Sequence, residues 1–309
     1  MAEDFERVQA RLGNISSVKP ILGAMRTISL GSWQSALKKQ ESLQAFEENF
    51  RNILALLIPK LPEKRLPKRN RLAVYDRMLA QDTGEDQPEK LILLVIGSER
   101  GLCGGFNNSI MSFAQDRFSH HQSQGKNVEL WALGSRIIRM LERGETKLTW
   151  SRSMSTTALP AYSLAHELTS HWLNEYEAYR LDKVEVLFNR YKAPGVYTPT
   201  VKQMIPPKLT KKTKRRPKPV KGLWPPPIIE TDPIGIYIKV IQQMTTMGFY
   251  QTLINSAAAE HAARYQLMEE AGQNSDRLVE EMTEILQMYR RQAITQEMQE
   301  LAAGAGLLS

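Results

Sequence analysis

The last part of the chain is the feature that most limits its possible folds. Between Pro233 and the end at residue 309 there is no further proline, and apolar residues follow a heptad pattern. This seam consists of Val240, Met244, Met247, Ile254, Ala258, His261, Tyr265, Met268, Val279, Met282, Leu286, Tyr289 and Ala293, interrupted only at Gln251, Gly272 and Ser275. A helix of about 75 residues would be roughly 110 Å long. Because no compact domain of this size could contain it, we expect a protruding helix whose seam a second helix covers.

The start of the chain supplies the one candidate for that second helix. Apolar residues three and four apart form a helical stripe: Phe5, Val8, Leu12, Ile15, Val18, Leu22 and Met25. The stripe resumes after Gly31 and stops before "IPKLPEKRLPKRN", whose prolines forbid a helix. An interior Pro20 costs about 3 kcal/mol and Gly23 about 1 kcal/mol, so we expect a kink or break near 18–23. The two ends are predicted to pair as an antiparallel coiled coil.

The middle of the chain has the pattern of an α/β domain. "LILLVI", "VELWAL", "KVEVLFNRY" and "VYTPTVKQMIPP" read as strands, with helical segments between the first three. This alternation predicts a doubly wound sheet, although the last two strands could instead form an antiparallel edge.

The predicted fold is therefore mixed, with an α/β (Rossmann-like) domain inserted between two coiled-coil helices. We expect an N-terminal helix over 1–58, the inserted domain over 70–206, a basic proline-rich loop over 207–232 and a C-terminal helix over 233–309. Asp232 and Pro233 suit the N-cap and first position of that last helix.

The net charge of +8 is concentrated in one segment. Residues 208–221, "KLTKKTKRRPKPVK", contain no acid, and outside them the basic residues equal the 33 acidic ones in number. The segment includes Lys211, Lys212, Lys214, Arg215 and Arg216. It could be a solvated loop, or it could bind an anionic membrane surface. Nucleic acid is a poorer partner, because Trp224 is the one aromatic residue nearby and stacking positions are missing.

The remaining motifs argue against an enzyme with a cofactor or metal. "GSERGLCGGFN" follows a strand but lacks both the G-K-[ST] ending of a P-loop and the G-x-G-x-x-G spacing, so we expect a packing turn. His166 and His171 are five apart and cannot share a metal on one helix face. His120 and His121 are expected to be exposed. Cys103, the single cysteine, is expected in the core and excludes an internal disulfide. The chain has neither a membrane-spanning run nor a secretory signal, which predicts a soluble or peripheral protein.

Several motifs resemble those of the gamma subunit of the F-type ATP synthase, the central rotor shaft. "SERGLCGGFN" is similar to the family's S-D-R-G-L-C-G-G-L-N, and "AAAEHAARYQLMEEA" is similar to S-E-H-A-A-R-M-x-A-M. "QAITQEMQELAAGAGLL" resembles Q-A-A-I-T-Q-E-L-x-E-I-x-x-G-A-A-A-L, and "NISSVKPILGAM" stands where the family has I-x-S-V-x-x-x-x-K-I-T-K-A-M. These motifs cover both terminal helices and the start of the inserted domain.

The resemblance implies a non-catalytic, peripheral subunit at the cytoplasmic face of a bacterial-type plasma membrane. Its implied partners are three alpha and three beta subunits, an epsilon subunit and the membrane c-ring. The implied contacts with the catalytic ring are Met25, Arg26, Arg290, Arg291, Thr295 and Glu297. The uncharged tip, with Leu301, Leu307 and Leu308, would turn in an apolar sleeve, where a charge would meet a desolvation cost. Tyr191, Glu99 and Arg100 would belong to the foot that faces epsilon and the c-ring.

Some positions depart from the family pattern. Pro20 and Gly23 replace residues of the K-I-T-K segment, Arg291 stands where the family has glutamine, and Glu99 replaces the aspartate of S-D-R-G. The single cysteine excludes a redox-regulated chloroplast type. Two other functions stay open: a gamma-derived, non-rotary protein that uses its basic loop on an anionic surface, and a nucleotide-dependent enzyme built on the α/β domain.

Overall fold

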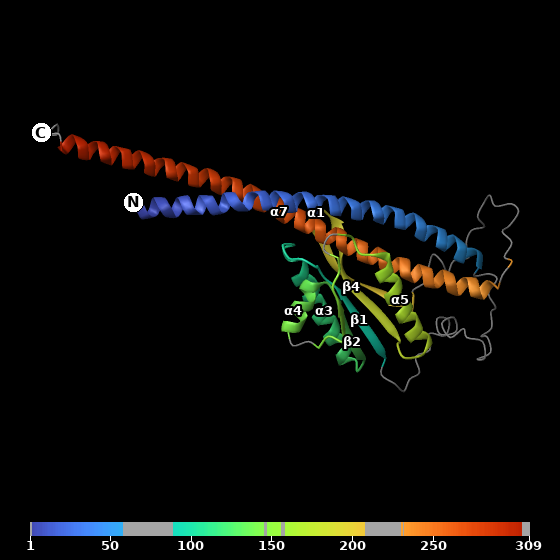
Figure 1. The fold of residues 1–309 in the computed structure, drawn as a ribbon. Helices are drawn as coiled ribbons and strands as arrows, with labels where there is room; N and C mark the ends of the chain where they lie inside the picture. Colours follow the sequence, from blue (N-terminus) through green and yellow to red (C-terminus); the bar gives the residue numbers. More distant parts are fainter. Residues whose placement is uncertain are drawn as a thin grey trace. The chain divides into compact units, whose positions relative to one another are not determined.

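The computed structural model describes residues 2–57, 89–144, 147–155, 158–207, 230 and 232–304 (Figure 1). The chain divides into two compact units. The terminal unit comprises Met1–Leu30 and Arg264–Ser309, and the central unit comprises Gly31–Ala263. The elements in chain order are α1 (Ala2–Leu57), β1 (Lys90–Ile96), α3 (Phe106–Ser123), β2 (Asn127–Leu133), α4 (Ser135–Arg143), β3 (Trp150–Arg152), α5 (Tyr162–Glu177), β4 (Lys183–Ala193), β5 (Val196–Ile205) and α7 (Pro233–Gly304).

Helix α1 continues through Pro20, so the expected break is wrong. Two ion pairs within the terminal unit join α1 to α7 around this position, Lys19 to Asp276 at 2.5 Å and Arg26 to Glu269 at 2.8 Å. These pairs are solvent-exposed and each contributes little to stability. They show, however, that α1 on either side of the proline lies along one partner helix, and such tertiary packing can outweigh a local penalty of about 3 kcal/mol.

Helix α7 begins where the sequence predicted. The Asp232 carboxylate accepts hydrogen bonds from the backbone N–H of Ile234 at 3.2 Å and of Gly235 at 3.0 Å. Pro233 is the first helical residue, where its missing N–H costs nothing. The helix then spans 72 residues, close to the length expected from the heptad pattern.

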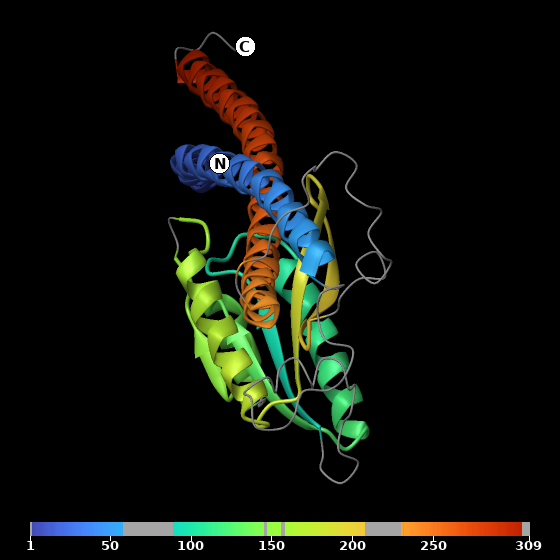
Figure 2. The same ribbon diagram turned by 90° about the vertical axis from the view of Figure 1, so that its right-hand side faces the viewer.

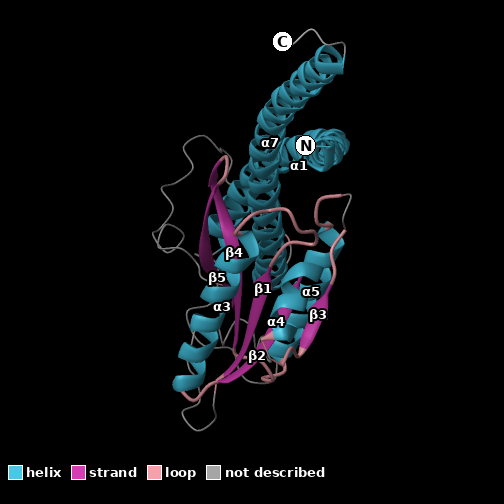
Figure 3. Ribbon diagram, turned by 90° about the vertical axis from the view of Figure 1, so that its left-hand side faces the viewer, coloured by secondary structure: helices cyan, strands magenta, loops and turns pink. Residues whose placement is uncertain are grey.

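The central unit contains one five-stranded sheet in the order β3-β2-β1-β4-β5, shown in magenta in Figure 3. All neighbours are parallel except β4 and β5, which form an antiparallel hairpin. The sheet is thus mixed, and the antiparallel alternative for the last two strands is the one realised. Strand β3, only three residues long, was not predicted.

Helices cover both faces of this sheet (Figures 1 and 2). Helices α3 and α4 pack on one face, against a core that includes Leu93, Ile110 and Ile137. On the other face α5 packs together with the parts of α1 and α7 that belong to the central unit. There the rings of Trp172 and Phe249 meet edge to face, with centroids 4.9 Å apart. The later part of α1 and the first part of α7 therefore contribute to the core of the central unit.

Candidate contact sites and the polar clusters behind them

The glycine-rich turn after β1 is held by its own side chains. Asn107 accepts a hydrogen bond from the Ser98 backbone N–H at 2.9 Å and donates one to the Ser98 hydroxyl at 2.7 Å. A Cβ at Gly97 would lie 2.3 Å from the Cβ of Ile137, so only glycine lets α4 approach the turn. Cys103 is buried, as expected. The turn thus packs helices on the sheet, in agreement with the sequence interpretation.

Glu99, assigned by resemblance to the foot, caps the start of α4. Its carboxylate accepts hydrogen bonds from the backbone N–H of Ser135 at 3.0 Å and of Met154 at 2.8 Å, and a further one from the Ser135 hydroxyl. Partial burial raises the pKa of Glu99, but these hydrogen bonds and the charge of Arg139 outweigh it, so the pKa is lowered. The neighbouring Arg100 is exposed. Glu99 therefore shapes the loop that carries Arg100.

Tyr191, the other foot residue, is half-buried in the central unit. Its ring lies 6.2 Å from that of Trp33 in α1, measured between centroids, and its backbone N–H donates to Asn255 of α7 at 3.0 Å. The hairpin residue Val196, in contrast, is 53% exposed. Tyr191 thus ties β4 to both terminal helices, whereas Val196 at the hairpin turn exposes its apolar side chain.

The residues proposed to touch the catalytic ring lie in the terminal unit. Arg290 and Glu297 line a groove of about 460 Å³ that also contains Phe5 of α1. Arg26 is held by Glu269, and Met25 is half-buried. Arg291 and Thr295 are exposed, with the Thr295 hydroxyl bonded to the Arg291 carbonyl at 2.8 Å.

Several large apolar side chains of this unit are also exposed. They are Val18, Ile21, Ile28, Met288, Ile294, Met298 and Leu301, the last with 73% of its surface accessible. Exposed apolar residues in such number mark a surface that a partner covers. Leu307 and Leu308 lie outside the described residues, as do Lys211, Lys212, Lys214, Arg215 and Arg216 of the basic loop.

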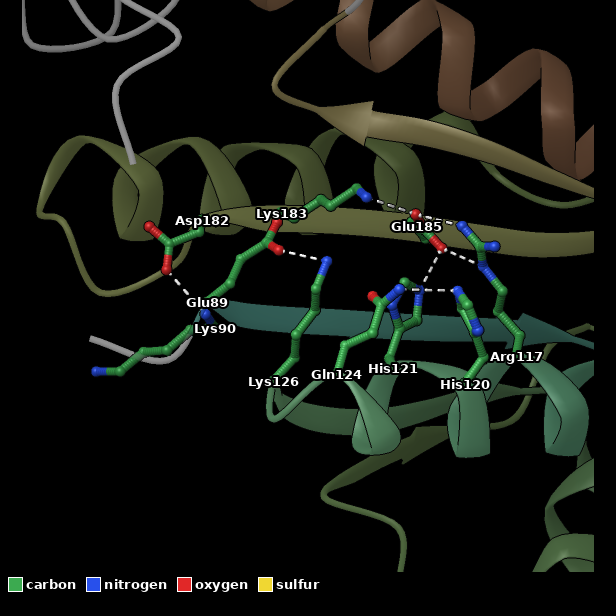
Figure 4. A network of polar contacts seen from close by, with 10 residues as sticks. All are labelled: Glu89, Lys90, Arg117, His120, His121, Gln124, Lys126, Asp182, Lys183 and Glu185. Carbon is green, nitrogen blue, oxygen red and sulfur yellow. Dashed lines mark hydrogen bonds and ion pairs between the residues drawn. The ribbon is translucent and has the colours of Figure 1, made fainter. Parts of the chain in front are cut away.

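A buried cluster around Glu185 was missed in the sequence (Figure 4). Arg117 of α3 binds both carboxylate oxygens of Glu185 at 2.8 and 2.9 Å. Lys183 lies 2.8 Å from the same carboxylate, and the Nε2 of His121 lies 3.0 Å from it. His121 is only 2% exposed, so the expectation that it faces solvent is wrong. The cluster joins the last turns of α3 to β4.

The environment of Glu185 favours its charged form. Burial alone would raise the pKa of this carboxyl, but hydrogen bonds from Arg117, Lys183 and His121 lower it to about 2. Such a carboxylate is a structural anchor, because its oxygens are already occupied by cations of its own domain. Among the residues that the structure describes, no three His, Cys, Asp or Glu side chains are grouped to hold a metal ion. No helix in the described ranges is both long and apolar enough to cross a membrane.

Comparison with known proteins decides the family. The sequence profile of the ATP synthase family matches residues 4–308. The chain belongs to the ATP synthase family. Its relatives include gamma chains: the ATP synthase gamma chain of Paracoccus denitrificans is 25% identical over 299 residues, covering 96% of this chain and 97% of the relative. That of Synechococcus sp. (strain JA-3-3Ab) is 26% identical over 328 residues, covering 99% of both.

Solved structures of the family share the fold. A chain of the Euglena gracilis mitochondrial ATP synthase, in a structure of OSCP, F1 and the c-ring in rotational state 3, has a TM-score of 0.63 at 12% identity. It covers 100% of this chain, and 95% of its own length is matched. A second Euglena gracilis structure, described as the rotor in rotational state 1, has a TM-score of 0.59 and covers 95% of this chain and 100% of its own.

Proposed function

We propose that this chain is the central rotor shaft of a rotary F-type ATP synthase. The observation that carries the proposal is the family match over residues 4–308, which includes both terminal helices as well as the inserted domain. As a non-catalytic subunit, it couples ion flow through the membrane c-ring to conformational change in the beta subunits. The rotation angle of the shaft sets which catalytic site is open. This dependence is a coupling free energy between ion flow and nucleotide affinity. Its partners are three alpha subunits, three beta subunits, epsilon and the c-ring.

The shaft itself is proposed to be an antiparallel coiled coil of α1 and α7. Two ion pairs support this pairing, because seven residues forward along α1, from Lys19 to Arg26, the partner lies seven residues back along α7, from Asp276 to Glu269. Seven residues are two helical turns, the heptad period of a coiled coil. The groove that Phe5 shares with Arg290 continues the same antiparallel order. The domain boundaries expected from the sequence, 1–58, 70–206, 207–232 and 233–309, belong to this proposal.

The contact residues have distinct proposed roles. Polar contacts to a beta-subunit loop are assigned to Arg290, Arg291, Thr295 and Glu297. These side chains are exposed in the terminal unit and so are accessible to a partner. Leu301, Leu307 and Leu308 form the tip in its apolar sleeve, and Met25 and Arg26 form a bearing contact below it. In the foot, Tyr191, Glu99 and Arg100 act towards epsilon and the c-ring, with Glu99 acting through the loop that it holds. The subunit is proposed to be peripheral, at the cytoplasmic face of a bacterial-type plasma membrane.

A non-rotary binding protein is the alternative, in which residues 208–221 hold an anionic surface. Deleting 208–221 separates the two functions. A rotor without a second role keeps its ATPase coupling after the deletion, whereas a surface-binding protein loses its association with vesicles that contain acidic lipid.

Co-expression with the alpha and beta subunits encoded in the same genome tests the rotor proposal. We expect a tagged beta subunit to co-purify one copy of this chain for three alpha and three beta, with ATPase activity well above that of a complex lacking the chain. A matched variant, Leu301→Asp, places a charge on the exposed tip. We expect it to lower the ATPase activity of the complex while the chain still folds. Failure of the wild-type chain to join the complex would refute the proposal.

A further inference from the structure

A polar cleft of about 370 Å³ lies within the central unit. It is bounded by parts of α1, β4, β5 and α7. Its lining is rich in hydrogen-bond donors: Gln40, Gln44, Arg190, Lys202, Gln251 and Asn255. Glu47 is the one acidic residue of this lining, so the cleft carries a net positive charge.

Lys202 of β5 is a partly buried cation in the lining of this cleft. Its ammonium donates to the Gly248 carbonyl at 2.9 Å and to the Thr252 hydroxyl at 3.3 Å. Both acceptors are uncharged, and an ammonium group has three donors. Burial lowers the pKa of Lys202, the charge of Glu47 raises it and the charge of Arg190 lowers it further. Burial and Arg190 thus outweigh Glu47, and a bound anion beside Lys202 and Arg190 would favour the charged ammonium.

Two further groups direct donors to the same place. The side-chain oxygen of Asn255 is occupied by the Tyr191 backbone N–H at 3.0 Å, which leaves the Asn255 NH₂ group available for donation. Arg190 is exposed and lines the cleft, and it forms neither a hydrogen bond nor an ion pair with the described part of the chain. Donors from β4, β5 and α7 therefore converge on one cleft.

We propose that this cleft binds a phosphate group, either free inorganic phosphate or the phosphate of a nucleotide. A tetrahedral oxyanion presents several acceptor oxygens, which suits donors arriving from three elements better than a single neutral ligand would. The volume is within the range of small-ligand sites, about 300–1,000 Å³. Glu47 opposes the anion and limits its affinity. The site goes beyond the proposed rotor function, since its lining belongs to the central unit and includes none of the residues proposed to contact the beta subunits or to form the tip.

The test uses the full-length chain, titrated with inorganic phosphate at fixed ionic strength and followed by ³¹P NMR line broadening and calorimetry. We expect saturable binding that Lys202→Met weakens at least tenfold and Arg190→Gln weakens several-fold. Glu47→Gln should tighten binding, because the repelling charge is gone. Lys192→Gln is the matched control, an exposed lysine on β4 outside the cleft lining, and should leave affinity unchanged.

Competition with AMP distinguishes the two sources of phosphate. Stronger binding of AMP than of inorganic phosphate assigns the site to a nucleotide phosphate, and the reverse assigns it to free phosphate. The proposal is overturned if phosphate does not saturate, or if Lys192→Gln weakens binding as much as Arg190→Gln does. Should Lys202→Met fail to fold, the opposite effects of Arg190→Gln and Glu47→Gln decide the outcome. Failure of the rotor proposal would show in the subunit complex and leave this titration unaffected.

Discussion

Replacing Glu185 by glutamine is expected to lower the free energy of unfolding of the central unit by about 3 kcal/mol at pH 7. The reason is that Arg117 and Lys183 would remain charged beside a side chain that no longer carries a negative charge. Urea unfolding followed by tryptophan fluorescence measures this, since Trp131, Trp150 and Trp172 all belong to the unit.

The pH dependence of this difference has a definite sign. The pKa of Glu185 in the folded chain is about 2, below its ordinary value of 4.5. A lowered pKa gives stability that is present above the unfolded value and is lost as the pH falls towards the folded one. The difference between wild type and Glu185→Gln should therefore shrink between about pH 4.5 and pH 2. Glu175→Gln is the control, because its pair with the exposed Arg180 lies at the surface, where removing an ion pair changes stability little. An equal loss in both variants would contradict the assigned role of Glu185.

Trp172→Ala is expected to destabilise the central unit by about 3–5 kcal/mol. Trp172 is fully buried on α5, and its ring contacts Phe249 of α7, so the substitution leaves a cavity where α5 meets the C-terminal helix. The effect should appear as a lower urea midpoint at an unchanged slope.

Trp172→Phe is the matched control for this cavity. The indole N–H of Trp172 is buried without a hydrogen-bond partner in the described structure, so phenylalanine removes an unsatisfied donor and keeps most of the aromatic contact. We expect a change of at most about 1 kcal/mol. If phenylalanine were as damaging as alanine, the edge-to-face contact with Phe249 would not be what stabilises this interface.

Regular patterns in the sequence were sufficient to predict most of the fold. The heptad seam predicted α7, and Asp232 predicted the hydrogen-bonded N-cap of that helix. The proline cluster predicted the end of α1. Four short segments with a strand pattern predicted β1, β2, β4 and β5. These features depend on local periodicity and chain stiffness, which one sequence displays directly.

The failures share a dependence on residues far apart in the chain. Pro20 remains helical because α1 lies along α7, a contact that local propensity does not contain. His121 is buried because Glu185, 64 positions later, accepts its hydrogen bond. Charged residues on a helix or turn are normally exposed, and only the folded sheet reveals which of them meet.

The pairing of the two chain ends is the central claim, and chemical cross-linking within the purified complex tests it most directly. In a Cys103→Ser background, the double variant Lys19→Cys with Asp276→Cys should be joined by a short bis-maleimide, because these side chains form an ion pair at 2.5 Å. The control, Lys19→Cys with Glu284→Cys, moves one thiol about 12 Å along α7 and should give little product. ATPase activity should survive the cross-link, since both thiols belong to one rotating shaft. Equal cross-linking in both variants, or none in the first, would contradict the antiparallel shaft.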